Sequence, residues 1–393
     1  MFTLSRQQVR LFRLHAHHLD TWYSLKDALH IAGACGLQNS PPGAWEAALH
    51  NRIRDLERQD PARLLEEDKS LLQAWSFRGA PVVFPTRQSG SFLSALIPQP
   101  GEPFVYTQGI GLALDFLQLP FDWLLELLVQ TMPRLKGVTL CGKAVLDQTL
   151  AGWMAPELPA DKRPLWEAPS MYGSPDRQTV GGAVVSFLLR PCSLMGLVVF
   201  GKRKGGQPTF TAPETWLGRP LPPAQDAALQ LVRSYVHCYA PASVQGFASW
   251  LGCSLAQAKR LWSCAEDQLE PVLLDGRRRF VLSDDLEALL SPPPAARELH
   301  LLKGHDPYLG LFDREVILDD RAWQRRGWQT VSNPGVVLWQ GEVCGIWTQR
   351  KKGPVMDVAV SLRRHLPREA LEELLQRHAL FSKARIGTLT IQE

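Results

Sequence analysis

The sequence lacks any apolar stretch that could cross a membrane. No run approaches the roughly 18 uninterrupted apolar residues that a membrane-spanning helix needs. The opening residues, MFTLSRQQVRLFRLHAHH, also lack the apolar core of a secretory signal. These two absences predict a cytoplasmic protein that does not enter a membrane.

The sequence also lacks a large excess of charge of one sign. The net charge is only +4 over 393 residues. Binding to a polyanion such as DNA must therefore be argued from where the basic side chains lie, because their total gives little information.

Cysteine pairs of the CxxC type are absent. The seven cysteines are spread through segments that otherwise read as helices and strands, so the sequence predicts neither a zinc ribbon nor a disulfide framework. We expect these cysteines to be reduced and buried. Among the nearby histidines His15, His17 and His18, positions 15 and 18 share one helical face. No third ligand of suitable type and spacing is evident, so no metal site is predicted.

Residues 224–290 give the clearest local pattern. An amphipathic helix is expected before Ala240-Pro241, a second helix capped by Ser243, and a third capped by Ser254. The run PVLLDGRRRFVLS then predicts a hairpin that turns at Asp275-Gly276, a dipeptide that tolerates positive φ angles. Three helices followed by a β-hairpin predict a winged helix, a helix-turn-helix variant that binds DNA.

The same order recurs twice upstream. Helices near 120–133, 142–154 and 178–190 precede a hairpin whose turn is GKRKGGQ. At the N-terminus, helices are expected near 5–19, 24–34, 42–57 and 61–75, followed by the extended segment SFRGAPVVF. From residue 297 onward, short β-rich runs with a helix and a last strand predict a small β domain.

Basic side chains gather on the predicted turns and on one helix, where DNA phosphates would be met. A solvated turn is the alternative for any single one of these groups. The candidates on the turns and the helix are Lys202, Arg203, Lys204, Lys259, Arg260, Arg277, Arg278 and Arg279, with Arg350, Lys351 and Lys352 on a further expected turn. Arg78 stands at a strand start, where a phosphate contact and a structural salt bridge are equally expected.

Five blocks, in order, resemble the AlkZ/YcaQ-like family of bacterial DNA glycosylases. They are GLQNSPPGAWEAALHNRI at 36–53, AWSFRGAP at 74–81, FGKRKGGQPTFTAPETWLG at 200–218, HDPYLGLFDR at 305–314 and GEVCGIWTQRKKG further on. The resemblance implies an α+β fold of three tandem winged-helix modules around a basic channel, plus a C-terminal β-rich domain. The expected domains are 1–100, 101–223, 224–290 and 297–393.

The resemblance also implies an activity, which is hydrolysis of the N-glycosidic bond of N7-alkylated guanines by a monofunctional glycosylase. The implied partner is double-stranded DNA bearing bulky lesions or crosslinks. The resemblance implies no cofactor, and we expect a monomer. Alkylation at N7 already activates the leaving base, so the enzyme has to position a water and stabilise a cationic sugar.

In the family this role falls to a Gln-x-Gln or Gln-x-Asp pair. Gln38 matches the first position, and Ser40 stands where the second carboxamide or carboxylate is expected. Asn39 is the nearest group of similar chemistry, so the candidate catalytic residues are Gln38, Asn39 and Ser40. Retention of Gln38 favours an enzyme. Ser40 favours the alternative, a non-catalytic winged-helix protein for damage recognition or regulation.

Overall fold

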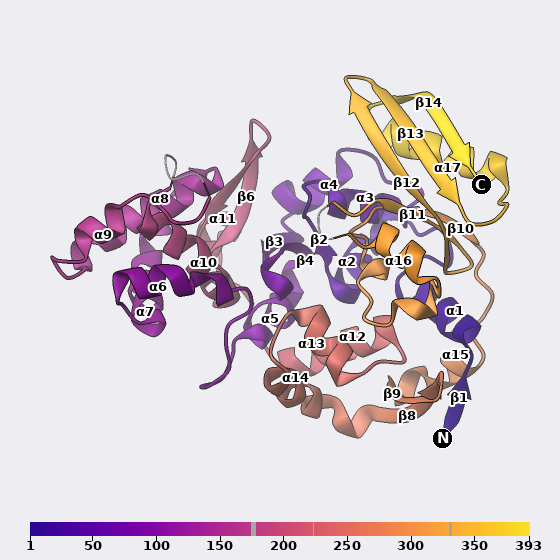
Figure 1. Ribbon diagram of the computed structural model, residues 1–393, viewed down its shortest axis with the longest axis horizontal. Helices are drawn as coiled ribbons and strands as arrows, with labels where there is room; N and C mark the ends of the chain where they lie inside the picture. Colours follow the sequence, from indigo (N-terminus) through magenta and orange to yellow (C-terminus); the bar gives the residue numbers. More distant parts are fainter. Residues whose placement is uncertain (174–177, 223, 330–331) are drawn as a thin grey trace. The chain divides into compact units, whose positions relative to one another are not determined.

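The computed structural model describes residues 1–393 except 174–177, 223 and 330–331, and it divides into two units (Figure 1). Unit 1 comprises Met1–Ala62, Val232–Trp250 and Arg260–Glu393, and unit 2 comprises Arg63–Leu231 and Leu251–Lys259. Each unit is a mixture of helices and small sheets, so the predicted α+β class is confirmed. The four predicted domain ranges stay a prediction, and the boundary expected at residue 223 lies outside the described residues.

The N-terminal part of unit 1 contains three of the predicted helices. They are α1 (Arg6–Ala16), α2 (Ala28–Cys35, after a 3-10 turn) and α3 (Ala44–His50). Ser5 caps α1 through a capping box with Gln8. The helix expected at 61–75 is wrong. Only a short helical segment extends to Glu67, and Leu71–Trp75 forms strand β3.

Unit 2 is built on a helical core with two small hairpins. Strand β3 pairs antiparallel with β4 (Pro81–Pro85). The helices that follow are α6 (Gly111–Leu117), α7 (Phe121–Thr131), α8 (Lys143–Met154), α9 (Arg163–Glu167) and α10 (Val180–Leu194). Helices α7, α8 and α10 bury one continuous apolar cluster, because each presents a face of aliphatic side chains at helical spacing. Strands β5 (Thr139–Cys141), β6 (Val199–Lys204) and β7 (Gln207–Thr211) complete this unit.

The helix and hairpin pattern expected at 224–290 is confirmed at the level of elements. Helices α12 (Ala227–Tyr239), α13 (Val244–Leu251) and α14 (Leu255–Trp262) precede strands β8 (Leu269–Leu274) and β9 (Arg277–Leu282). Ser243 and Ser254 accept the backbone N–H bonds of Gly246 and Gln257, as helix caps do. Asp275 and Gly276 turn the hairpin with φ angles of 49° and 73°.

The C-terminal part of unit 1 is a five-stranded sheet backed by a helix, which confirms the predicted β-rich region (Figure 1). The order is β10 (Leu299–Leu302), β11 (Gly335–Trp339), β12 (Glu342–Lys352), β13 (Val355–Leu362) and β14 (Arg385–Gln392). Helix α17 (Arg368–Phe381) lies against it, with Leu371 and Leu375 in the shared core. The last strand, β14, joins parallel to β13.

All seven cysteines lie among the described residues, and each is a free thiol. Four of them are buried as expected, but Cys264 is exposed and Cys141 and Cys253 are partly exposed, so the prediction of burial is wrong for these three. Within the described part of the chain, no helix is both long and apolar enough to cross a bilayer.

Candidate active site

Gln38 is held at the end of a short strand in unit 1. Helix α2 ends at Cys35, and Gly36, with a φ of 71°, turns the chain into β2 (Leu37–Gln38). The Nε2 of Gln38 donates to the carbonyl oxygen of Ser40 at 3.2 Å and lies 3.5 Å from Nδ1 of His305. The side chain is half-buried. The carboxamide is therefore oriented by two neighbours and is not a mobile surface group.

Asn39 and Ser40 have different surroundings from Gln38. Asn39 is buried, and its Oδ1 accepts the backbone N–H of Gly43 at 2.8 Å, just before α3. This bond closes the loop onto the start of the helix. Ser40 is exposed and is followed by a cis peptide bond to Pro41. The structure thus ties the oxygen of Asn39 to the backbone and leaves Ser40 at the surface.

The turn that carries His305 is fixed by a buried ion pair. Asp306 accepts two hydrogen bonds from the guanidinium of Arg52, each 2.8 Å long, and both side chains are nearly inaccessible to solvent. Asp306 also accepts the backbone N–H of Tyr308. Arg314, in the same HDPYLGLFDR block, lies over the ring of Trp328.

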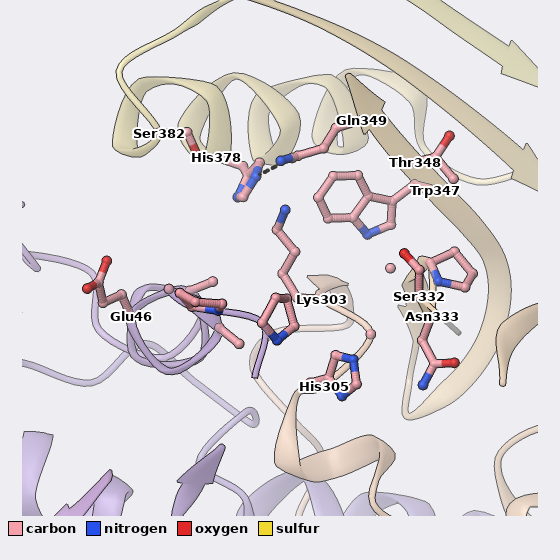
Figure 2. A pocket seen from close by; sticks show the side chains of 18 of the residues that line it. Glu46, Lys303, His305, Ser332, Asn333, Trp347, Thr348, Gln349, His378 and Ser382 are labelled. Carbon is pink, nitrogen blue, oxygen red and sulfur yellow. Dashed lines mark hydrogen bonds between the residues drawn. The ribbon is translucent and has the colours of Figure 1, made fainter. Parts of the chain in front are cut away.

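A cavity of about 630 Å³ lies beside this turn, entirely within unit 1. Its walls come from the loop after Ser40, from the start of α3, from the His305 turn, from β12 and from α17. Figure 2 shows the Lys303 amine projecting into the space between Trp347 and the His378–Gln349 pair. His305, which contacts Gln38, lies in the wall as well. The cavity therefore combines an aromatic face, a cation and several amides close to the candidate catalytic loop.

Burial controls the charges in the cavity. Desolvation lowers the pKa of Lys303 to about 8, and its ammonium lies 4.9 Å from the centre of the Trp347 ring. Burial, followed by the nearby Lys303 charge, lowers the pKa of His378 to about 3. His378 is accordingly neutral near pH 7, and its Nε2 lies 2.8 Å from Oε1 of Gln349. The wall thus carries the cations of Lys303 and Arg58, the carboxylate of Glu46 and the neutral imidazole of His378.

Replacing Lys303 by methionine is expected to stabilise the fold at pH 7. The pKa of Lys303 in the fold, about 8, is below its ordinary value of 10.5. The unfolded chain therefore binds this proton more tightly, and wild-type stability rises with pH between these values. The advantage of Lys303→Met is expected to be largest below pH 8 and to vanish above about pH 10.5. Urea unfolding at several pH values measures it, with the exposed Lys204→Met as control. An equal pH profile for the two variants would contradict the assignment.

The basic candidates lie on both units, and most of them reach solvent. In unit 2, Lys202 pairs with Glu66 at 3.4 Å, Lys204 and Lys259 are exposed, and Arg203 donates to the carbonyl of Gly206 at 2.6 Å. Arg78 is half-buried in unit 2, with its guanidinium 4.9 Å from the ring of Phe77.

In unit 1, Arg277 and Arg278 are exposed on the β8–β9 hairpin, and Arg279 and Arg260 are half-buried. Arg277 lies 3.6 Å from Glu315. The turn expected at Arg350, Lys351 and Lys352 is wrong, because these residues form the end of strand β12 and pair with β13. They remain exposed beside the turn at Gly353.

Sequence reasoning missed most of the cavity. Lys303, Trp347, Gln349 and His378 come from segments that were interpreted only as a β-rich domain with a helix. One signal was available, since His305 begins the HDPY block of the family resemblance. The other wall residues carry no motif, and only the fold brings them together.

Comparisons with known proteins find similar chains among the DNA glycosylases. A relative from Streptomyces sahachiroi, named interstrand DNA cross-link repair glycosylase, is 25% identical over 359 residues, or 87% of each chain. The solved structure of Streptomyces sahachiroi DNA glycosylase AlkZ matches with a TM-score of 0.74 and 24% identity. That match covers 99% of this chain and all of the other, and it supports the fold.

The family model described as DNA glycosylase AlkZ-like matches residues 31–383. The chain therefore belongs to the AlkZ-like DNA glycosylase family, which confirms the resemblance found in the sequence.

Proposed function

We propose that this protein is a DNA glycosylase that hydrolyses the N-glycosidic bond of N7-alkylated guanine, including bulky adducts and interstrand crosslinks. The observation that carries the proposal is the placement of Gln38 in this family member. Its carboxamide is oriented by the Ser40 carbonyl and by His305, beside a large cavity. The name of the Streptomyces relative supports the crosslink as substrate class.

The chemistry asks little of the protein beyond positioning. An N7-alkylated guanine carries a positive charge and leaves as a neutral base, so no strong general acid is needed. Gln38 orients the attacking water and places its carbonyl dipole near the cationic sugar. The proposed reaction adds one water across the C1′–N9 bond and yields an abasic sugar and the free modified base. The scheme uses water and neither a covalent protein nucleophile nor a catalytic metal, so the enzyme acts as a monofunctional glycosylase.

The cavity offers a place for the modified base or its bulky substituent. Its volume of about 630 Å³ falls in the range that holds small-molecule ligands. Trp347 and Phe381 line the cavity, although Trp347 is only 2% exposed, and amides such as Asn333 and Gln349 can hydrogen-bond to a base edge. This arrangement fits a planar, polar occupant better than an aliphatic one.

The basic hairpins are proposed to hold the DNA backbone. The three helix and hairpin groups, within 1–100, 101–223 and 224–290, are interpreted as winged-helix modules, whose hairpins contact phosphates. The exposed side chains on them, among them Lys204, Arg277 and Arg278, are available for such contacts. Strand β12 adds Arg350 and Lys352 at a third hairpin. The proposed ligand is double-stranded DNA.

Removing the charges of one hairpin is expected to weaken DNA binding and reduce its salt dependence. Each lost phosphate contact lowers the slope of log affinity against log salt by about 0.9. The Arg277→Ala, Arg278→Ala, Arg279→Ala triple variant is therefore expected to lower the slope by as much as about 3. Fluorescence anisotropy over a salt series measures the slope. The control is the triple alanine variant at Arg321, Arg325 and Arg326, which are exposed on α16 (Arg321–Gly327). Equal slopes for the two triple variants would contradict the assignment of the hairpin.

One observation favours a second function, a non-catalytic DNA-binding protein. The position of the second family carboxamide is a serine, and the nearest alternative oxygen, Oδ1 of Asn39, is bound to the Gly43 backbone. The two functions are separated by incubating the protein with duplexes that carry N7-methylguanine, a bulky N7 adduct or a crosslink. Alkali-labile abasic sites support the glycosylase, and tight binding without them on every substrate supports the second function.

A further inference from the structure

Three metal-binding side chains meet in the core of unit 1. His17 follows α1, Cys35 is the last residue of α2, and Cys238 lies near the end of α12. All three are buried, and one ligand atom from each lies within 4.8 Å of the other two. They are far apart in the sequence, so only the packing of the three helices brings them together. We call this group the His17 cluster.

The spacing in the His17 cluster is close to that of zinc ligands. Nδ1 of His17 lies 3.9 Å from Sγ of Cys35. With Zn–S bonds of about 2.3 Å and Zn–N bonds of about 2.0 Å, ligand atoms in a tetrahedral site are about 3.5–3.8 Å apart. Each ligand therefore has to move by less than about 1 Å to hold the ion. The Tyr239 hydroxyl, 3.9 Å from Sγ of Cys35, is a further oxygen at the edge of the cluster.

The surroundings of the cluster favour a cation held by thiolates. Among the described residues, Nδ1 of His17 has the Cys35 thiol at 3.9 Å as its hydrogen-bond partner, and Nε2 is buried without one, so this imidazole is poorly satisfied as an ordinary core side chain. Two thiolates and one divalent ion also sum to zero charge, which suits a dry interior.

We propose that His17, Cys35 and Cys238 form a binding site for a thiophilic divalent metal ion, with zinc as the expected occupant. Zinc accepts two sulfur ligands and one imidazole in the geometry that these side chains approach. Sequence reasoning had rejected a metal because it looked for the third ligand near His15 and His18. In the structure His15 instead pairs with Asp20 at 2.9 Å, and His18 stacks edge-on with Tyr23 and His30.

The site gives the metal a structural purpose. Cys35 ends the helix that leads through Gly36 into Gln38. The ring of His17 packs edge-on against Tyr308, which follows the His305 turn, and the His17 carbonyl accepts a hydrogen bond from Arg52. A metal bound here joins the supports of Gln38 and of its neighbour His305. Its role is to hold the two segments in place, and it does not touch the substrate.

The test is the metal content of the full-length protein, purified without a histidine tag. We expect about one zinc per chain by inductively coupled plasma mass spectrometry. After exchange into cobalt, we expect about one cobalt per chain and a thiolate-to-cobalt charge-transfer absorption band. Less than about a tenth of a zinc per chain, together with no cobalt band, would overturn the proposal. A Cys35–Cys238 disulfide in the native protein would do the same. Neither readout depends on base release, so the result stands apart from the proposed function.

The zinc content of cysteine variants tests whether the ion binds at the His17 cluster. Cys35→Ala and Cys238→Ala are each expected to reduce the zinc content at least about tenfold. Cys192→Ala is the matched control, because Cys192 is equally buried but lies in α10 of unit 2. Circular dichroism checks that each variant folds, and the wild-type measurement decides the question if a variant does not. Zinc retained by both folded variants would place the ion elsewhere and overturn the assignment.

Discussion

The Gln38→Ala variant is expected to release the modified base from an N7-alkylguanine duplex about 100-fold more slowly than the wild type. Alanine removes the carboxamide that the Ser40 carbonyl and His305 orient, so the water and the developing sugar cation lose their main polar neighbour. DNA affinity is expected to change little, because phosphate contacts from the basic hairpins supply most of it. Single-turnover base release and equilibrium binding measure the two effects separately.

The matched control for this experiment is Gln130→Ala. Gln130 is an exposed glutamine on α7 in unit 2, and its amide contacts Glu126. We expect wild-type base release from it. If Gln38→Ala also retained the wild-type rate, Gln38 would have no catalytic role, and the chemistry would have to be assigned to another group.

The Asp306→Ala variant is expected to lose about 3–5 kcal/mol of folding free energy. Asp306 and Arg52 are almost completely buried. Two hydrogen bonds of 2.8 Å join the carboxylate to the guanidinium, so the two charges neutralise each other. Removing the carboxylate leaves an uncompensated guanidinium in the core and frees the turn that carries His305. Denaturant unfolding monitored by tryptophan fluorescence measures the loss.

An exposed ion pair in the same unit provides the comparison. Arg6 and Asp275 lie 3.0 Å apart, but both are more than a third exposed. Arg6→Ala is expected to cost less than about 1 kcal/mol, since solvent and salt screen such pairs. A comparably small loss for Asp306→Ala would show that the buried pair does not hold the turn.

Local signals in the sequence predicted much of the fold. The hairpin at Asp275-Gly276 and the caps at Ser243 and Ser254 depend on neighbouring residues alone, and the structure confirms them. Leu71–Trp75 was assigned to a helix because a short apolar run has no period that separates a helix from a strand. All five of its side chains are buried in the structure, which is typical of an interior strand.

The site was predicted only in part. Gln38 was predicted because it lies in a contiguous block, residues 36–53, that resembles the family. Lys303, Trp347 and His378 lie on a turn, a strand and a helix that meet only in the folded C-terminal sheet. The His17 cluster joins residues more than 200 positions apart, from His17 to Cys238. No spacing rule reaches across such distances, because tertiary packing alone sets them.

The most direct test of the account is hydrolysis of a duplex with a single N7-alkylguanine in water enriched in ¹⁸O. We predict that wild-type protein releases the intact alkylated base and places one ¹⁸O atom on C1′ of the abasic sugar, as mass spectrometry of the two products would detect. An intact glycosidic bond in DNA that the protein demonstrably binds would contradict it.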